Sequence, residues 1–101
     1  MKLTIITIAY NSAKEIRRTI ESVLNQERGD IPYTIEYLII DGASSDATVE
    51  IAESYIPAMT AGGIDYRISS EPDRGIYDAM NKGIRLASGD IIGILNSGDW
   101  Y

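Results

Sequence analysis

Two kinds of apolar pattern alternate along the chain. In one, apolar and mostly β-branched residues follow one another without interruption, as is typical of strands buried on both faces of a sheet. In the other, apolar residues recur every three or four positions, as in a helix with one buried side. The predicted strands are residues 3–9, 35–40, 64–69 and 91–95. The predicted helices cover about 14–26, a segment that begins near residue 46, and a segment from 77 to 87.

The residues at the helix boundaries refine these assignments. Ser12 and Glu15 have the spacing of a capping box, and Asp46 is a favourable N-cap for the second helix. The second helix should turn Val49, Ala52 and Ile56 inward, and the third should turn Tyr77, Met80, Ile84 and Ala87 inward. Gly89 is expected to end the third helix.

The order of strands and helices predicts an α/β fold. Strands that alternate with helices form βαβ units, in which a parallel sheet carries helices on both faces. We expect the strand that begins at Leu3 to lie beside the one that begins at Ile35. The sequence ends two residues after Asp99, close to a strand end, so we expect residues 1–101 to be part of a larger domain.

Composition narrows the classes of function. The chain has no cysteine and no histidine, which excludes a disulfide framework and histidine-based catalysis. Its formal net charge of -6 argues against nucleic acid as a partner, whereas a nucleotide remains compatible if a divalent cation supplies positive charge. No apolar run approaches the roughly 20 residues that span a bilayer, and the N-terminus lacks the pattern of a secretory signal. We therefore expect a cytoplasmic protein.

Polar residues follow each predicted strand at its carboxyl end, where open α/β sheets bind their ligands. In chain order they are Tyr10-Asn11-Ser12, Asp41, the segment 70–75 with Asp73 and Arg74, and Asn96-Ser97-Gly98-Asp99. Because parallel strands end on the same side of a sheet, these residues should lie along one edge. They would supply an aromatic ring, several carboxylates and a cation.

Each of these residues also has a structural interpretation. Asp41 suits the turn before the second helix, Asp73 suits the N-cap of the third, and Arg74 suits a solvated surface. The phosphate-binding motifs of other protein classes are absent, since neither GxxxxGK[ST] nor GxGxxG occurs. A receiver-type signalling domain has a similar size and order of elements, but it needs an acidic cluster where Asn11 stands. Phosphorylation of Asp41 would distinguish that alternative.

Five segments, spread over nearly the whole length of the chain, resemble family 2 glycosyltransferases. They are Thr4-Ile5-Ile6-Thr7-Ile8-Ala9-Tyr10-Asn11, Thr19-Ile20-Glu21-Ser22-Val23-Leu24-Asn25-Gln26, the loop 39–48, the segment 71–84 and Ile94-Leu95-Asn96-Ser97-Gly98-Asp99-Trp100. The segment 71–84 is similar to a branch of bacterial polysaccharide-synthesis enzymes. The resemblance implies a GT-A, Rossmann-like fold for nucleotide-diphospho-sugars, with residues 1–101 as the donor-binding part.

The resemblance also implies roles for single residues. The nucleotide would contact Thr7, Ala9, Tyr10, Asn11, Asp41, Asp73, Arg74, Asn96 and Ser97. Tyr10 would pack near the base, Asp41 would accept a hydrogen bond from it, and Asp99 would bind Mg²⁺ or Mn²⁺ at the diphosphate. The general base would lie beyond Tyr101, so we expect the fragment alone to be inactive.

The resemblance implies a reaction in which a sugar is transferred with inversion to a saccharide or lipid-linked acceptor. The donor that it implies is a UDP-sugar. The full-length protein is expected to be cytoplasmic, with a peripheral position at the inner face of the membrane as the alternative. A non-catalytic nucleotide-binding or regulatory module of the same fold is the competing interpretation.

Four positions depart from the family pattern. Gly42 stands where a second acid often follows Asp41, and Asn96 and Gly98 replace acids of the metal motif. Met80 stands where the family often has arginine. The replacements at Asn96 and Gly98 leave Asp99 as the only carboxylate of that motif, and this thinned motif is the feature that favours the non-catalytic alternative.

Overall fold

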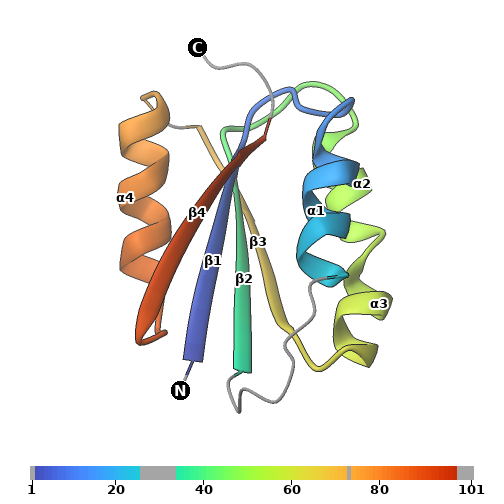
Figure 1. The fold of residues 1–101 in the computed structure, drawn as a ribbon. Helices are drawn as coiled ribbons and strands as arrows, with labels where there is room; N and C mark the ends of the chain where they lie inside the picture. Colours follow the sequence, from blue (N-terminus) through green and yellow to red (C-terminus); the bar gives the residue numbers. More distant parts are fainter. Residues whose placement is uncertain (1, 26–33, 73, 98–101) are drawn as a thin grey trace.

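Four parallel strands form one sheet. The computed structural model describes residues 2–25, 34–72 and 74–97. The strands are β1 (Lys2–Ala9), β2 (Thr34–Asp41), β3 (Asp65–Ser70) and β4 (Ile91–Ser97), in the order β3-β2-β1-β4 (Figure 1). Leu3 of β1 is in register with Ile35 of β2 and with Ile91 of β4. The predicted parallel pairing of the first two strands is therefore confirmed.

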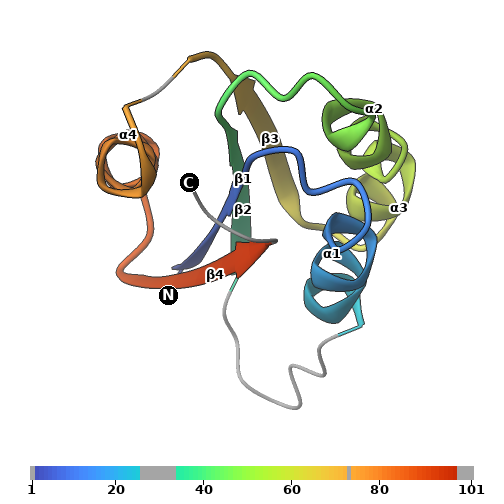
Figure 2. The ribbon, with the colours of Figure 1, turned by 90° about the horizontal axis from the view of Figure 1, so that it is seen from above.

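The helices cover both faces of the sheet, as predicted. They are α1 (Ile16–Leu24), α2 (Thr48–Glu53), α3 (Ile56–Ala61) and α4 (Ile76–Leu86). Seen from above, α1, α2 and α3 lie on one side of the strands and α4 lies alone on the other (Figure 2). The result is a three-layer α/β arrangement.

Alternation along the strands divides the core into two clusters. On β1, Ile5 and Ala9 face α1, α2 and α3, whereas Ile6 and Ile8 face α4. All four side chains are buried, which explains why the sequence of this strand is apolar without interruption. The pattern that predicted a doubly covered strand thus reflects two separate layers of packing.

The predicted second helix is two short helices, and the expectation that Ile56 faces inward is wrong. Ile56 is 44% exposed, while Tyr55 and Met59 occupy the buried positions beside it. The chain turns between α2 and α3, and Pro57 lies in the first turn of α3, where its missing N–H costs nothing. Because α3 is a separate helix, its buried side is not continuous with that of α2. The four-residue spacing from Ala52 to Ile56 therefore does not place Ile56 on the buried side.

The inward face of α4 also differs from the prediction. Tyr77 is 79% exposed and Ile84 is 47% exposed, although Met80 and Ala87 do pack against the core. Ala79 and Gly83 instead bring the helix close to the sheet, and a Cβ on Gly83 would lie 2.7 Å from Cγ2 of Ile6. Small residues face the sheet because they permit this close approach. The helix itself ends at Leu86, before the predicted Gly89.

The start of α1 corrects the predicted capping box. Glu15 is the N-cap residue and makes no side-chain capping hydrogen bond. Oγ of Ser12 bonds to the backbone of Tyr10, and the carbonyl oxygen of Ser12 accepts the N–H groups of Glu15 and Ile16. The loop after β1 is therefore longer than expected, and Ser12 belongs to it.

β4 is one of the two outer strands of the sheet, and it carries apolar side chains on both faces. Ile91, Ile92, Ile94 and Leu95 of β4 are between 36% and 50% exposed.

None of the helices in the described ranges is long and apolar enough to cross a bilayer.

Candidate functional site

The carboxyl ends of the strands meet at one edge of the sheet, at the top of Figure 1. Ala9 is in register with Asp41 on one side and with Ser97 on the other, and Asp41 is in register with Ser70. The loops that follow β1, β2 and β3 therefore begin beside one another. Sequence reasoning predicted this arrangement, and the register of the strands confirms it.

Among the described residues at this edge, Asp41 is the most enclosed carboxylate, with only 1% of the residue exposed. Its Oδ2 accepts the backbone N–H of Ser44 at 2.8 Å and the hydroxyl of Ser70 at 2.8 Å. Its Oδ1 accepts the hydroxyl of Ser44 at 2.5 Å. The carboxylate thus joins the end of β2 to the following loop and to the end of β3.

The loops after β1 and β2 are held together by Asn11 and Ser44. The backbone N–H of Asn11 donates to Oγ of Ser44 at 2.8 Å, and Oδ1 of Asn11 accepts the N–H of Ser45 at 2.9 Å. Asn11 and Ala43 both have positive φ, at 47° and 61°. Asparagine tolerates this left-handed region better than alanine does, so the loop after β2 is locally strained at Ala43.

Asp46 adds a second connection between the same loops. Its Oδ2 accepts the N–H of Ala13 at 3.2 Å, and its Oδ1 accepts the N–H of Thr48 at 3.0 Å and the Thr48 hydroxyl. Partial burial alone would raise the pKa of Asp46, but the hydrogen bonds from Thr48 and Ala13 lower it overall. The N-cap of α2 is Ala47, which makes no side-chain capping hydrogen bond, so the prediction of Asp46 as the N-cap is wrong by one residue. Asp46 nevertheless supports the first turn of α2 through Thr48.

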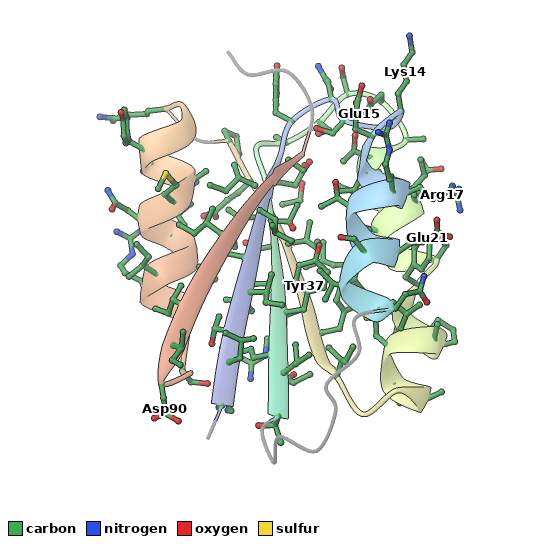
Figure 3. All side chains as sticks on the ribbon, in the orientation of Figure 1. Lys14, Glu15, Arg17, Glu21, Tyr37 and Asp90 are labelled. Atoms are coloured by element: carbon green, nitrogen blue, oxygen red, sulfur yellow. The ribbon has the colours of Figure 1, made fainter. Side chains whose placement is uncertain are left out.

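Thr7 and Ala9, both predicted to contact a nucleotide, are fully buried in β1. Oγ1 of Thr7 lies 2.6 Å from the hydroxyl oxygen of Tyr37, which points into the layer between the sheet and α1 (Figure 3). Burial raises the pKa of Tyr37 to about 12, so this phenol remains protonated at neutral pH. The structure therefore does not bring the side chain of Thr7 to the edge.

The segment after β3 lies beside the start of α4. Arg74 is exposed, and its backbone N–H donates to Oδ2 of Asp78 at 2.9 Å. Nζ of Lys82 donates to the carbonyl oxygen of Pro72 at 2.8 Å and lies 3.3 Å from Oε1 of Glu71. Within the described ranges, Arg74 makes no ion pair.

The structure describes several of the predicted site residues only in part or not at all. Asp73 and Asp99 lie outside the described residues. Asn96 and Ser97 belong to the end of β4, next to β1, and their side chains are not described. Tyr10 is partly buried at the end of β1. The described residues contain no group of three or more acidic side chains that could hold a metal ion, so Asp99 as its ligand stays a prediction.

Sequence reasoning did not single out Ser44 and Ser70, the two residues that hold Asp41. Ser44 follows Asp41 by three positions, a spacing at which an aspartate often accepts a local backbone N–H, so it had a weak sequence signal. Ser70 had none, because its contact with Asp41 depends on the pairing of β2 with β3.

A family profile described as Glycosyl transferase family 2 matches residues 4–101. The chain belongs to this family. A glycosyltransferase of Mycobacterium tuberculosis is 41% identical over 100 residues, which are 98% of this chain and 34% of that protein. A PGL/p-HBAD biosynthesis glycosyltransferase of Mycobacterium bovis is 33% identical over 96 residues, 95% of this chain and 35% of its own length. The chain thus spans about a third of these relatives.

Solved structures of glycosyltransferases share the fold. Residues 1–349 of TarS from S. aureus, in complex with UDP-GlcNAc, align with a TM-score of 0.75 and 22% identity, over 95% of this chain and 26% of that one. The mannosyltransferase PcManGT from Pyrobaculum calidifontis, in complex with GDP-Man and Mn²⁺, aligns with a TM-score of 0.75 and 25% identity. The alignment covers 93% of this chain and 26% of that one. The predicted GT-A fold is therefore confirmed.

Proposed function

We propose that this chain is the donor-binding part of an inverting glycosyltransferase that uses a uridine diphosphate sugar. Family membership supports glycosyl transfer, and two structural neighbours are described with a nucleotide-sugar bound. The observation that carries the choice of site is the position of Asp41. Its carboxylate lies at the carboxyl edge of the sheet, between the loops that follow β1 and β2.

In this proposal Asp41 accepts a hydrogen bond from the base, and Tyr10 packs beside the ring. A nearly dry carboxylate makes a strong acceptor, and a base that fails to donate to it loses much affinity. Because Asp41 is only 1% exposed, entry of the base requires the loops 10–13 and 42–47 to separate slightly. Their connections are hydrogen bonds between polar side chains and backbone, which water or a ligand is able to replace.

The diphosphate lies, in this proposal, between the end of β4 and the start of α4. Asp99 is proposed to hold Mg²⁺ or Mn²⁺, and the exposed Arg74 would face the phosphates. When bound, the cation neutralises the charge that develops on the diphosphate leaving group. Transfer with inversion requires a carboxylate that deprotonates the acceptor hydroxyl, and we place that carboxylate after residue 101 in a full-length protein. The proposed acceptor is a saccharide or a lipid-linked saccharide.

Replacement of Asp41 tests the proposal directly. Asp41→Ala should weaken binding of UDP by about 1–3 kcal/mol, the usual cost of removing a buried hydrogen-bonding partner. Isothermal titration calorimetry measures the effect, and the unfolding transition of each variant is measured alongside. Asp65→Ala, at the opposite end of β3, is the matched control and should bind UDP like the wild type.

One result would contradict the assignment. Unchanged UDP affinity in a folded Asp41→Ala variant would show that Asp41 only joins the loops. Asp41→Asn offers a second measurement if the alanine variant does not fold, since it keeps the shape of the side chain and one acceptor oxygen.

A further inference from the structure

We propose that Ser70 is a specificity-determining residue that restricts Asp41 to bases with a single ring N–H donor. Ser70 does this without contacting the base, by occupying one acceptor position on the Asp41 carboxylate. This inference rests on the proposed function and adds to it the residue that selects among nucleobases. Solved structures with this fold are described with either UDP-GlcNAc or GDP-Man, so the fold alone does not decide the base.

The hydrogen bonds that Asp41 makes with described residues leave one acceptor position open. An ionised carboxylate has about four lone-pair positions, two on each oxygen. On Oδ2 both are occupied, one by the backbone N–H of Ser44 and one by the hydroxyl of Ser70. On Oδ1 one is occupied, by the hydroxyl of Ser44. A base therefore finds a single acceptor position, on Oδ1.

The bases differ in how many donors they present to such a carboxylate. The Watson–Crick edge of uracil has one N–H between two carbonyl oxygens, which suits one acceptor position. Guanine presents a ring N–H next to an amino group, and the pair bonds best to two carboxylate oxygens at once. With Oδ2 of Asp41 filled, the guanine amino group lacks its carboxylate partner, and a donor that loses its hydrogen-bond partner on binding is costly.

Ser70 is the residue to alter because its side chain makes one defined contact. It lies at the end of β3, its hydroxyl donates to Oδ2 of Asp41 at 2.8 Å, and the residue is exposed to solvent. Ser44, by contrast, contacts Asp41 through both its hydroxyl and its backbone and also accepts from Asn11. Removing the hydroxyl of Ser70 frees one position on Oδ2 and leaves the loop after β2 in place.

The test compares UDP with GDP on wild type and Ser70→Ala by calorimetry. The ratio of GDP to UDP dissociation constants should fall about tenfold in Ser70→Ala, the size of one net hydrogen bond. Ser70→Thr, which keeps the hydroxyl, should restore the wild-type ratio. Ser69→Ala is the matched control, since this neighbour lies on the same strand and its side chain points to the other face.

The outcomes separate this inference from the proposed function. If the wild type binds UDP and Ser70→Ala loses stability with an unchanged ratio, Ser70 is structural and the inference is wrong while the proposed function stands. If Ser70→Thr fails to restore the ratio, the hydroxyl is not responsible and the inference is also wrong. If the wild type binds neither nucleotide, the proposed function fails and the inference fails with it.

Discussion

Glu36 shows what a single buried carboxylate contributes at the edge of the sheet opposite the site. It is fully buried, and its Oε1 accepts the hydroxyl of Thr4 and the N–H of Ser88, each at 2.9 Å. The Ser88 hydroxyl donates to Oε2 at 2.9 Å. These bonds join β2 to β1 and to the turn before β4, near Asp90 at the bottom of Figure 3.

Burial alone would raise the pKa of Glu36, but hydrogen bonds from Ser88 and Thr4, with the charge of Lys2, lower it below its ordinary value of 4.5. A carboxyl group whose pKa is lower in the folded state stabilises the fold above its unfolded pKa. This contribution is lost as the pH falls through the folded value. The stabilisation by Glu36 is therefore complete above pH 4.5 and declines below it.

Glu36→Gln should lower the free energy of unfolding by about 1–3 kcal/mol at neutral pH, because hydrogen bonds to a charged acceptor become neutral ones. Urea unfolding at neutral pH and at a pH below 4.5 measures the effect. The difference between wild type and variant should shrink in acid, where Glu36 itself becomes neutral. Glu53→Gln, on the exposed side of α2, is the control. A difference that stays constant with pH would show that charge is not its source.

At the scale of elements, the packing of α4 on the sheet depends on the absence of a side chain at Gly83. A Cβ there would lie 2.7 Å from Cγ2 of Ile6 and 3.4 Å from Cγ1 of Ile40. Both isoleucines are buried, so neither has room to move away. The helix begins at the carboxyl edge of the sheet, so this contact also sets where Arg74 and the segment before α4 lie.

Gly83→Ala should destabilise the chain by about 1–2 kcal/mol. Alanine favours a helix by up to about 1 kcal/mol over glycine, but overpacking a core costs roughly 1–3 kcal/mol and here outweighs it. Gly93→Ala in β4 is the matched control, because no atom lies within 4 Å of an added Cβ there. Thermal unfolding distinguishes the two variants. A more stable Gly83→Ala protein would mean that α4 shifts on the sheet at little cost.

At the scale of the whole molecule, net charge governs how the proposed diphosphate ligand binds. The chain carries a formal net charge of -6, so a nucleotide diphosphate is repelled at long range. The exposed Arg74 supplies one positive charge near the edge. A divalent cation with the phosphates is therefore expected to bind far better than the phosphates alone. One carboxylate is a poor site for such a cation, which requires several oxygen ligands.

UDP and Mn²⁺ should consequently bind cooperatively, each weakly alone, because the phosphates complete the coordination of the metal. Asp99→Asn should remove this coupling and leave metal-free UDP binding nearly unchanged. Titrations of UDP with and without Mn²⁺ on both proteins measure it. By reciprocity, Mn²⁺ binding must improve by the same factor when UDP is present. Equal coupling in the two proteins would make Asp99 a turn residue.

The sequence alone determined the fold class and the position of Asp41 at the carboxyl edge of the sheet. Long apolar runs separated by helical spacing allow few arrangements other than a parallel sheet covered on both faces, because each apolar face must be buried. The same topology places all strand ends on one side, so Asp41 could be assigned to that edge before its neighbours were known. Resemblance of the segments then indicated the family, which the profile match shows.

The tertiary structure decided which side chains meet. Spacing within one segment did not reveal that Ile56, Tyr77 and Ile84 are exposed, because the phase of a helix depends on its neighbours. Nor did it reveal that Thr7 is held by Tyr37. The contact between Ser70 and Asp41 joins residues 29 positions apart and exists only because β2 and β3 pair in one register. Contacts between strands follow from that register, which depends on both paired strands and on their connection and not on one segment alone.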